Sequence, residues 1–167
     1  MSKKILNSLF AQKSWANGEL FNVMAAIPAS EHAAPVHTAI RTLNHIYVVD
    51  RIFRAHLLGE KHEYSATNTK ETPELDSLNF AVAETDHWFE EYVTNITDES
   101  LAESISFQFT DGDAGRMTRE EMLVHVITHG AYHRGNVGQV LKDIEIAPPR
   151  DLYTKFLHVS QPTRRHD

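Results

Sequence analysis

Hydrophobic positions recur at helical spacing over most of this 167-residue chain. Apolar residues three or four positions apart predict amphipathic helices over residues 2–27, 35–58, 72–95 and 118–144, with a shorter one over 151–159. Each long segment is too polar on one side to be buried all round, so the helices must pack their apolar faces together. The pattern therefore predicts an all-α protein built as a four-helix bundle.

Residues at the ends of these segments predict how the helices start and stop. Gly59 follows the second segment, where a glycine in the left-handed conformation commonly ends a helix. A polar linker without periodicity occupies residues 60–71, after which Thr72 is expected to cap the third helix. Thr118 and Glu121 fit the capping box, in which each side chain bonds the backbone N–H of the other residue. The fourth long helix therefore has the clearest start.

Between residues 104 and 117 the period changes from helical to two. Apolar and polar residues alternate strictly in Ser-Ile-Ser-Phe-Gln-Phe, and Thr-Asp-Gly-Asp then supplies a turn. This pattern predicts a short β-hairpin before the fourth long helix, too small to be a sheet domain. We expect residues 1–167 to form a single four-helix-bundle domain with that hairpin and a short C-terminal helix.

Composition and charge exclude several classes of function. Sixteen Lys and Arg against twenty-three Asp and Glu give a formal charge of -7, which argues against nucleic-acid binding, since such binding needs a basic face. The chain has no cysteine, which excludes disulfides, thiolate nucleophiles and iron–sulfur clusters. Neither a secretion signal nor an apolar stretch of spanning length is visible, so we expect no membrane partner and a cytoplasmic location. Eleven histidines are then the remaining candidates for a metal site.

Three of these histidines lie four residues apart in the fourth long helix, at His125, His129 and His133. Side chains four apart share one helix face, and this spacing lets two imidazoles reach one ion. On a helical wheel His133 lies nearest the apolar stripe, His129 next and His125 farthest. The pair turned toward the bundle interior is therefore His129 and His133, and His125 is expected at the rim or in a supporting role.

A metal site needs at least a third ligand, and it must come from another helix. The second segment offers His37, His45 and His56, and the spacing does not decide among them. In the same segment Asp50 and Arg54, four residues apart on the apolar stripe, are predicted to form a buried ion pair.

Other polar and small residues have simpler interpretations. Arg134 is expected in a surface ion pair, and the three glycines of the fourth helix suggest close approach by a neighbouring helix or ligand. Histidines in polar or terminal stretches are expected at the surface: His32, His37, His62, His158 and His166. Glu84 and His87 provide one Glu-x-x-His pair, but a di-iron carboxylate bundle needs two, so we interpret them as a solvated face.

The run from His45 to Phe53 resembles the second helix of the DinB family of damage-inducible bacterial proteins. The run from His125 to Leu141 resembles the fourth helix of that family, and Trp15-Ala16-Asn17 matches its usual opening. The resemblance implies a four-helix bundle, usually a homodimer, with a divalent metal held by one histidine of the second helix and two of the fourth.

Carried over to this chain, the implied metal ligands are His45, His129 and His133. His125 is usual in the family without being a ligand. Three imidazoles suit Ni or Zn best, with Fe, Co or Mn as further choices, and such a metal can activate water or a thiol.

The resemblance implies a metal-dependent enzyme of the thiol S-transferase or hydrolase type, acting on a small molecule with a low-molecular-weight thiol as a candidate cosubstrate. Candidates for a general base are His125, Asp50 and Glu121. The alternative is a non-catalytic stress-response protein that binds metal for stability or sensing.

Overall fold

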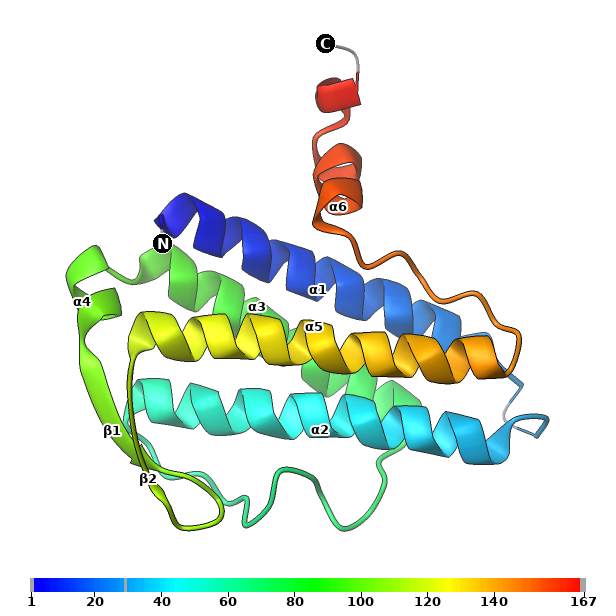
Figure 1. The fold of residues 1–167 in the computed structure, drawn as a ribbon, viewed down its shortest axis with the longest axis horizontal. Helices are drawn as coiled ribbons and strands as arrows, with labels where there is room; N and C mark the ends of the chain where they lie inside the picture. The colour runs from blue at the N-terminus through cyan, green and yellow to red at the C-terminus, as the bar shows by residue number, and fades with distance from the viewer. Residues whose placement is uncertain (1, 29, 166–167) are drawn as a thin grey trace.

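Four long helices lie side by side in the computed structural model, which describes residues 2–28 and 30–165 (Figure 1). In the bundle α1 packs chiefly against α3, and α2 packs chiefly against α5. The predicted all-α four-helix bundle is confirmed. None of the helices in the described ranges is both long enough and apolar enough to cross a membrane. The long helices are α1 (Lys3–Ala25), α2 (Ala33–Leu58), α3 (Leu75–Asn95) and α5 (Arg119–Asp143).

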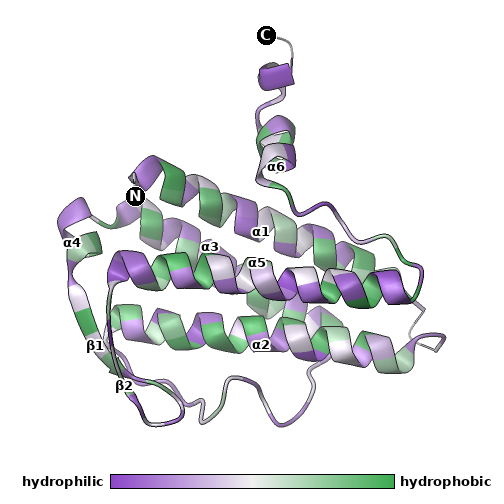
Figure 2. Cartoon of the chain, in the orientation of Figure 1, coloured by the Kyte–Doolittle hydropathy of each residue, from purple (hydrophilic) through white to green (hydrophobic). Residues whose placement is uncertain are grey.

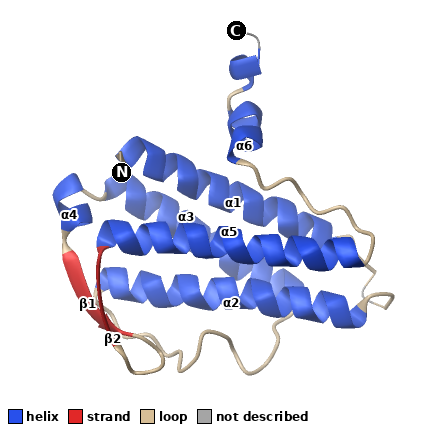
Figure 3. Cartoon of the chain, in the orientation of Figure 1, coloured by secondary structure: helices blue, strands red, loops and turns tan. Residues whose placement is uncertain are grey.

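The predicted hairpin and C-terminal helix are both present (Figure 3). In the antiparallel hairpin, Phe107 lies opposite Gly115. The helix α6 stands away from the bundle (Figure 1), attached through Phe156, whose ring lies 5.9 Å from that of Trp15. The sequence patterns did not predict α4 or the 3-10 helix η1, because segments of four or five residues are too short to show a period. The shorter elements are α4 (Asp98–Ala102), β1 (Ser104–Gln108), β2 (Ala114–Thr118), α6 (Tyr153–Ser160) and η1 (Pro162–Arg165).

Two of the three predicted helix ends are confirmed. Gly59 ends α2 with φ +69°, and Thr118 and Glu121 form the complete capping box of α5. The prediction for Thr72 was wrong, since α3 begins only at Leu75. The Thr72 hydroxyl instead shares a hydrogen bond of 2.9 Å with Nε2 of His37, which ties the linker to α2.

Replacing Gly59 by alanine should destabilise the protein by about 1–2 kcal/mol, the cost of a Cβ in left-handed backbone. No clash adds to this cost, because a Cβ at Gly59 would point into open space. Gly18→Ala is the matched control: Gly18 lies inside α1, and its Cβ would also meet open space. That variant should gain about 0.5–1 kcal/mol from helix propensity. Urea denaturation measures the free energy of unfolding of both variants. A change of the same sign in both would contradict the requirement for left-handed backbone at Gly59.

The bundle core is divided into two apolar clusters. Apolar and polar residues alternate around each long helix, so that each contributes one face to this core (Figure 2). One cluster lies near the hairpin and contains Leu6, Phe10, Val49, Phe53, Leu57, Phe89, Val93, Ile96, Leu101, Met122, Leu123 and Val126. The other lies toward the opposite end and contains Leu20, Phe21, Met24, Ile27, Ala39, Leu43, Ile46, Leu78, Val82, Val137 and Leu141.

A layer of buried charges separates the two clusters. The ammonium of Lys13, fully buried on α1, lies 2.7 Å from an oxygen of Asp50 and 2.5 Å from one of Asp86. The amide of Asn17 donates to the other oxygen of Asp86 at 2.7 Å. The predicted pair between Asp50 and Arg54 was therefore wrong. The guanidinium of Arg54 lies instead 4.7 Å from the centre of a Trp88 ring. The prediction failed because the position of Lys13 depends on helix packing, which the sequence pattern does not show.

The second cation of this layer is Arg134, which was predicted to form an ion pair at the surface. Its side chain is buried, and its Nε donates to a carboxylate oxygen of Asp151 at 2.7 Å. This contact ties the segment after α5 to the bundle.

The prediction that the glycines of α5 mark close approach by a neighbour gave a mixed result. A Cβ at Gly130 would lie 3.6 Å from Cε of Lys13, as close approach requires, whereas a Cβ at Gly135 would meet open space.

Candidate metal centre

Three histidines from two helices meet on one side of the charged layer. His129 and His133 lie one turn apart on α5, and their ring centroids are 4.5 Å apart. The ring of His45, from α2, lies 4.8 Å from that of His129 and 4.6 Å from that of His133. One nitrogen of each ring lies within 4.8 Å of the others. Because α2 packs on α5, the structure brings together all three residues that the family resemblance implied.

The polar linker orients His45. Its Nδ1 lies 2.7 Å from the carbonyl oxygen of Thr67, so Nδ1–H donates and Nε2 presents its lone pair to the other two rings. Asn44 of α2 holds the linker by donating to Oδ1 of Asn68 at 2.5 Å. Sequence reasoning missed Thr67, because a backbone carbonyl contact leaves no mark in the residue types. A partner of this kind fixes ring orientation and tautomer in metal-binding histidines.

The spacing and chemistry of the nitrogens fit a transition-metal ion. Nε2 of His45 and Nε2 of His129 lie 3.0 Å apart. Two ligands each about 2.1 Å from one ion are separated by about 3.0–3.4 Å when the angle at the ion is 90–110°. Nδ1 of His129 is buried without a partner among the described residues, whether its Nε2 bonds the ring of His45 or a metal ion. The donor set of three imidazoles could therefore hold a metal ion such as Zn, Ni, Co or Fe.

Burial keeps two of the three imidazoles in the form that binds metal. Desolvation, together with the nearby His133 and His45, lowers the pKa of His129 to about 3. Desolvation and His45 also lower the pKa of His133 below the ordinary value. Only a neutral imidazole has the lone pair that a metal needs. His129 and His133 are thus ready to act as ligands at neutral pH without first losing a proton.

Of the three candidate bases, His125 is the one whose ring contacts the triad. It stacks on His129 at 5.4 Å between centroids and on Phe53 at 4.5 Å, and burial lowers its pKa. Asp50 is occupied by Lys13 in the charged layer, and burial raises its pKa to about 6 despite that cation. Glu121 accepts the N–H of Thr118 in the capping box. The geometry therefore favours His125 as the supporting group.

Apart from His125, the other histidines of the described residues lie outside the triad. His37 is exposed, as predicted, whereas His32 and His158 are partly buried. The surface placement expected for His62 was wrong: it is half-buried, with its ring 5.3 Å from that of His56. The polar residues around His62 in the sequence gave no sign of its contact with His56, because that contact depends on how the chain turns after Gly59. His166 lies outside the described residues.

Fold and site together define a helical-bundle protein with a three-histidine cluster shared between its second and fourth long helices. Comparison with known sequences identifies the group. The DinB family model matches residues 1–165, and the chain therefore belongs to the DinB family. It is similar to the Protein DinB of Bacillus subtilis (strain 168), with 23% identity over 167 residues that cover 92% of this chain and 94% of that protein.

Proposed function

We propose that this DinB-family protein binds one divalent transition-metal ion through His45, His129 and His133 and uses it in catalysis. The observation that carries the proposal is the meeting of three imidazole nitrogens within 4.8 Å of one another, although His45 and His129 are 84 positions apart in the chain. The family membership supports the same assignment. Nickel or zinc suits the donor set best, followed by iron, cobalt or manganese.

The residues around the site have separable tasks. The carbonyl of Thr67 holds His45 in the tautomer that binds metal through Nε2. Burial keeps His129 neutral. When bound, the metal would lower the pKa of a water or thiol and so supply a nucleophile at neutral pH. His125, stacked on His129, would accept the proton that the water or thiol loses in forming this nucleophile.

The reaction class that fits is transfer to or from a low-molecular-weight thiol, or hydrolysis of a small electrophile. The chain contains no cysteine, so a thiol used in the reaction must arrive with a substrate or cosubstrate. The surplus of acidic residues argues against a nucleic-acid substrate.

Titration of EDTA-treated protein with Zn²⁺ or Ni²⁺ in a calorimeter tests the metal assignment, and one ion per chain is expected. The loaded protein is then assayed with a small thiol plus 1-chloro-2,4-dinitrobenzene, and separately with p-nitrophenyl acetate. Turnover that requires the metal supports the enzyme. One bound ion with no turnover across a panel of thiols and esters favours the non-catalytic metal-binding protein, and failure to bind either ion contradicts the site itself.

Metal affinity should fall as the pH is lowered, because protons and the ion compete for the same nitrogen lone pairs. Because burial lowers the pKa of His129 and of His133, protons compete less with the ion at these two nitrogens than at exposed imidazoles, and we expect the fall below about pH 6. The metal-free protein should also lose stability over this range. In the unfolded chain these imidazoles bind protons at their ordinary pKa, whereas in the folded chain burial keeps them neutral. The free energy of unfolding therefore decreases as the pH falls below about 6.5. Zinc affinity measured from pH 8 to pH 4 checks the prediction, and a constant affinity would contradict it.

A further inference from the structure

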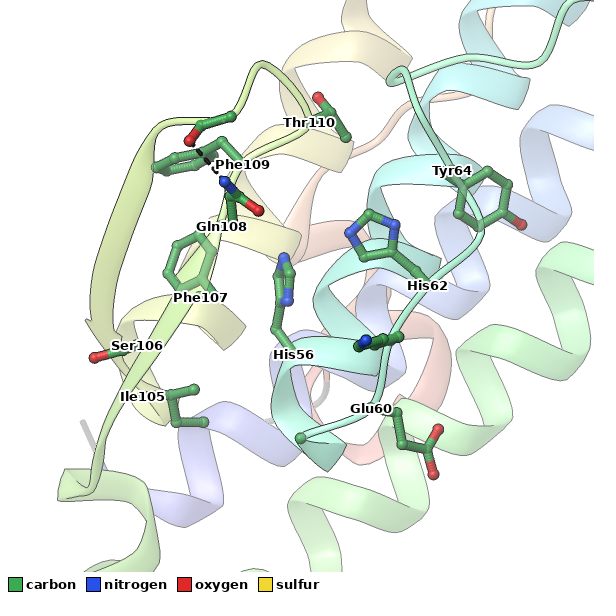
Figure 4. A pocket seen from close by; sticks show the side chains of 13 residues that line it. His56, Glu60, His62, Tyr64, Ile105, Ser106, Phe107, Gln108, Phe109 and Thr110 are labelled. Carbon is green, nitrogen blue, oxygen red and sulfur yellow. Dashed lines mark hydrogen bonds between the residues drawn. The ribbon is translucent and has the colours of Figure 1, made fainter.

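A pocket lies away from the histidine triad, between the C-terminal end of α2 and the hairpin (Figure 4). Its volume is about 520 Å³, within the range of small-molecule sites. The segment after Gly59 forms one wall and carries His62 and Tyr64, while β1 forms the opposite wall and carries Phe107. His56 extends from α2 between these walls.

Aromatic rings make up much of the pocket lining. The ring of His56 lies 4.7 Å from that of Phe107 and 5.3 Å from that of His62. Tyr64 follows at 6.3 Å from His62. Phe107 is fixed by the strand opposite, because the ring covers Gly115, where a Cβ would lie only 2.6 Å from it. These flat and rigid surfaces favour a planar ring over a flexible aliphatic chain.

The electrostatics of the pocket favour a neutral ligand. Burial and the adjacent His62 lower the pKa of His56, so its ring carries no charge at neutral pH. Lys61 and Glu60, also in the lining, have opposite charges. The pocket thus presents neither the cationic cluster that a phosphate needs nor an acidic one for a cation.

His62 supplies the polar group that would orient a ligand. Its Nδ1 is buried without a partner in the described part of the chain. Leaving a lone pair unpaired costs less than burying an unpaired N–H, so Nδ1 is the unprotonated nitrogen and Nε2 carries the hydrogen. In this tautomer the imidazole donates one hydrogen bond through Nε2. The complementary ligand therefore carries a hydrogen-bond acceptor.

We propose that the cavity formed by His56, His62, Tyr64 and Phe107 binds a neutral, planar aromatic molecule that bears a hydrogen-bond acceptor. The rings of the pocket stack on the planar group, and Nε2–H of His62 donates to the acceptor. The site is distinct from the triad, because the rings of Phe53 and His125 lie between His56 and His129. Binding here does not depend on the proposed metal.

Acetophenone is a suitable probe, since it is neutral, planar and carries a carbonyl acceptor. Imidazole signals of ¹³C-labelled histidine are followed by NMR during titration of the full chain, with and without one equivalent of Zn²⁺. We expect saturable shifts of the His56 and His62 signals in both conditions. Methyl cyclohexyl ketone, which lacks the planar ring, and benzoate, which is charged, should bind at least about tenfold more weakly.

The hydrogen bond is tested by comparing acetophenone with toluene, which lacks the acceptor. In the unaltered protein, acetophenone should bind about threefold to tenfold more tightly than toluene, as expected for one hydrogen bond. His62→Phe should abolish this preference while retaining a ring. His87→Phe, at an exposed position of α3, is the matched control and should preserve it.

Loss of the pocket wall gives an independent test. Phe107→Ala should weaken acetophenone binding about tenfold, with circular dichroism showing that the variant remains folded. Shifts confined to the triad histidines, no saturable shift at His56 and His62, or an unchanged preference in His62→Phe would each overturn the proposal. Failure of Zn²⁺ to bind would contradict the proposed function and leave this test unaffected.

Discussion

His129→Ala should abolish the binding of the divalent ion, reducing metal content from about one ion per chain to none. This histidine contacts both other members of the cluster, with its Nε2 3.0 Å from that of His45 and its ring 4.5 Å from that of His133. Its removal leaves two ligands on different helices, fewer than the three that protein metal sites of this kind use. His45→Ala and His133→Ala should have the same direction of effect. Elemental analysis after metal loading and gel filtration measures the outcome.

His125→Ala is the matched control for that series. Like His129 it is a half-buried histidine of α5, one turn before His129, but it stacks on the triad without joining it. The variant should retain the full complement of metal, and any turnover should decrease because its ring is the proposed proton acceptor. Full metal occupancy in His129→Ala, or loss of metal in His125→Ala, would show that the ligand assignment is incorrect.

Lys13→Met should destabilise the protein by about 3–5 kcal/mol, the cost of removing one partner from a buried ion pair. Methionine matches lysine closely in length, so the loss would come from charge rather than from a cavity. Without the ammonium, Asp50 and Asp86 face each other as buried carboxylates with Asn17 as the remaining neutral donor to Asp86. Urea denaturation at pH 7.5 measures the loss.

The pH dependence of this loss distinguishes charge from packing. Burial already raises the pKa of Asp50 to about 6, and loss of Lys13 would raise it further. A carboxyl whose pKa is raised by folding binds more protons in the folded protein than in the unfolded chain. The loss of stability in Lys13→Met is therefore complete above that pKa and becomes smaller as the pH falls. The deficit should therefore be smaller at pH 5 than at pH 7.5. Lys155→Met is the control: its amine lies 3.6 Å from Glu19 in a partly exposed pair, and its loss should cost less than about 1 kcal/mol. Equal losses in the two variants would contradict the role of the buried layer.

Much of the fold was predictable because it depends on neighbours in the sequence. The helical period, the strict alternation in the hairpin, Gly59 at the end of α2 and the capping box at Thr118 are all local features. The wheel also separated His129 and His133 from His125 correctly, as the three rings of the cluster show. Thr72 was misassigned because its hydroxyl bonds His37, a residue from another element.

The sequence by itself therefore determined the helices, the hairpin and the face of α5 on which two metal-binding candidates lie. Tertiary structure decided which other residues meet them. Packing of α2 on α5 brings His45, rather than His37 or His56, against that face. Packing of α1 in the bundle places Lys13 between Asp86 and Asp50, the carboxylate that periodicity had paired with Arg54. The physical reason is that helical spacing fixes the direction of a side chain on its own helix, whereas the partner it faces depends on how the whole bundle assembles.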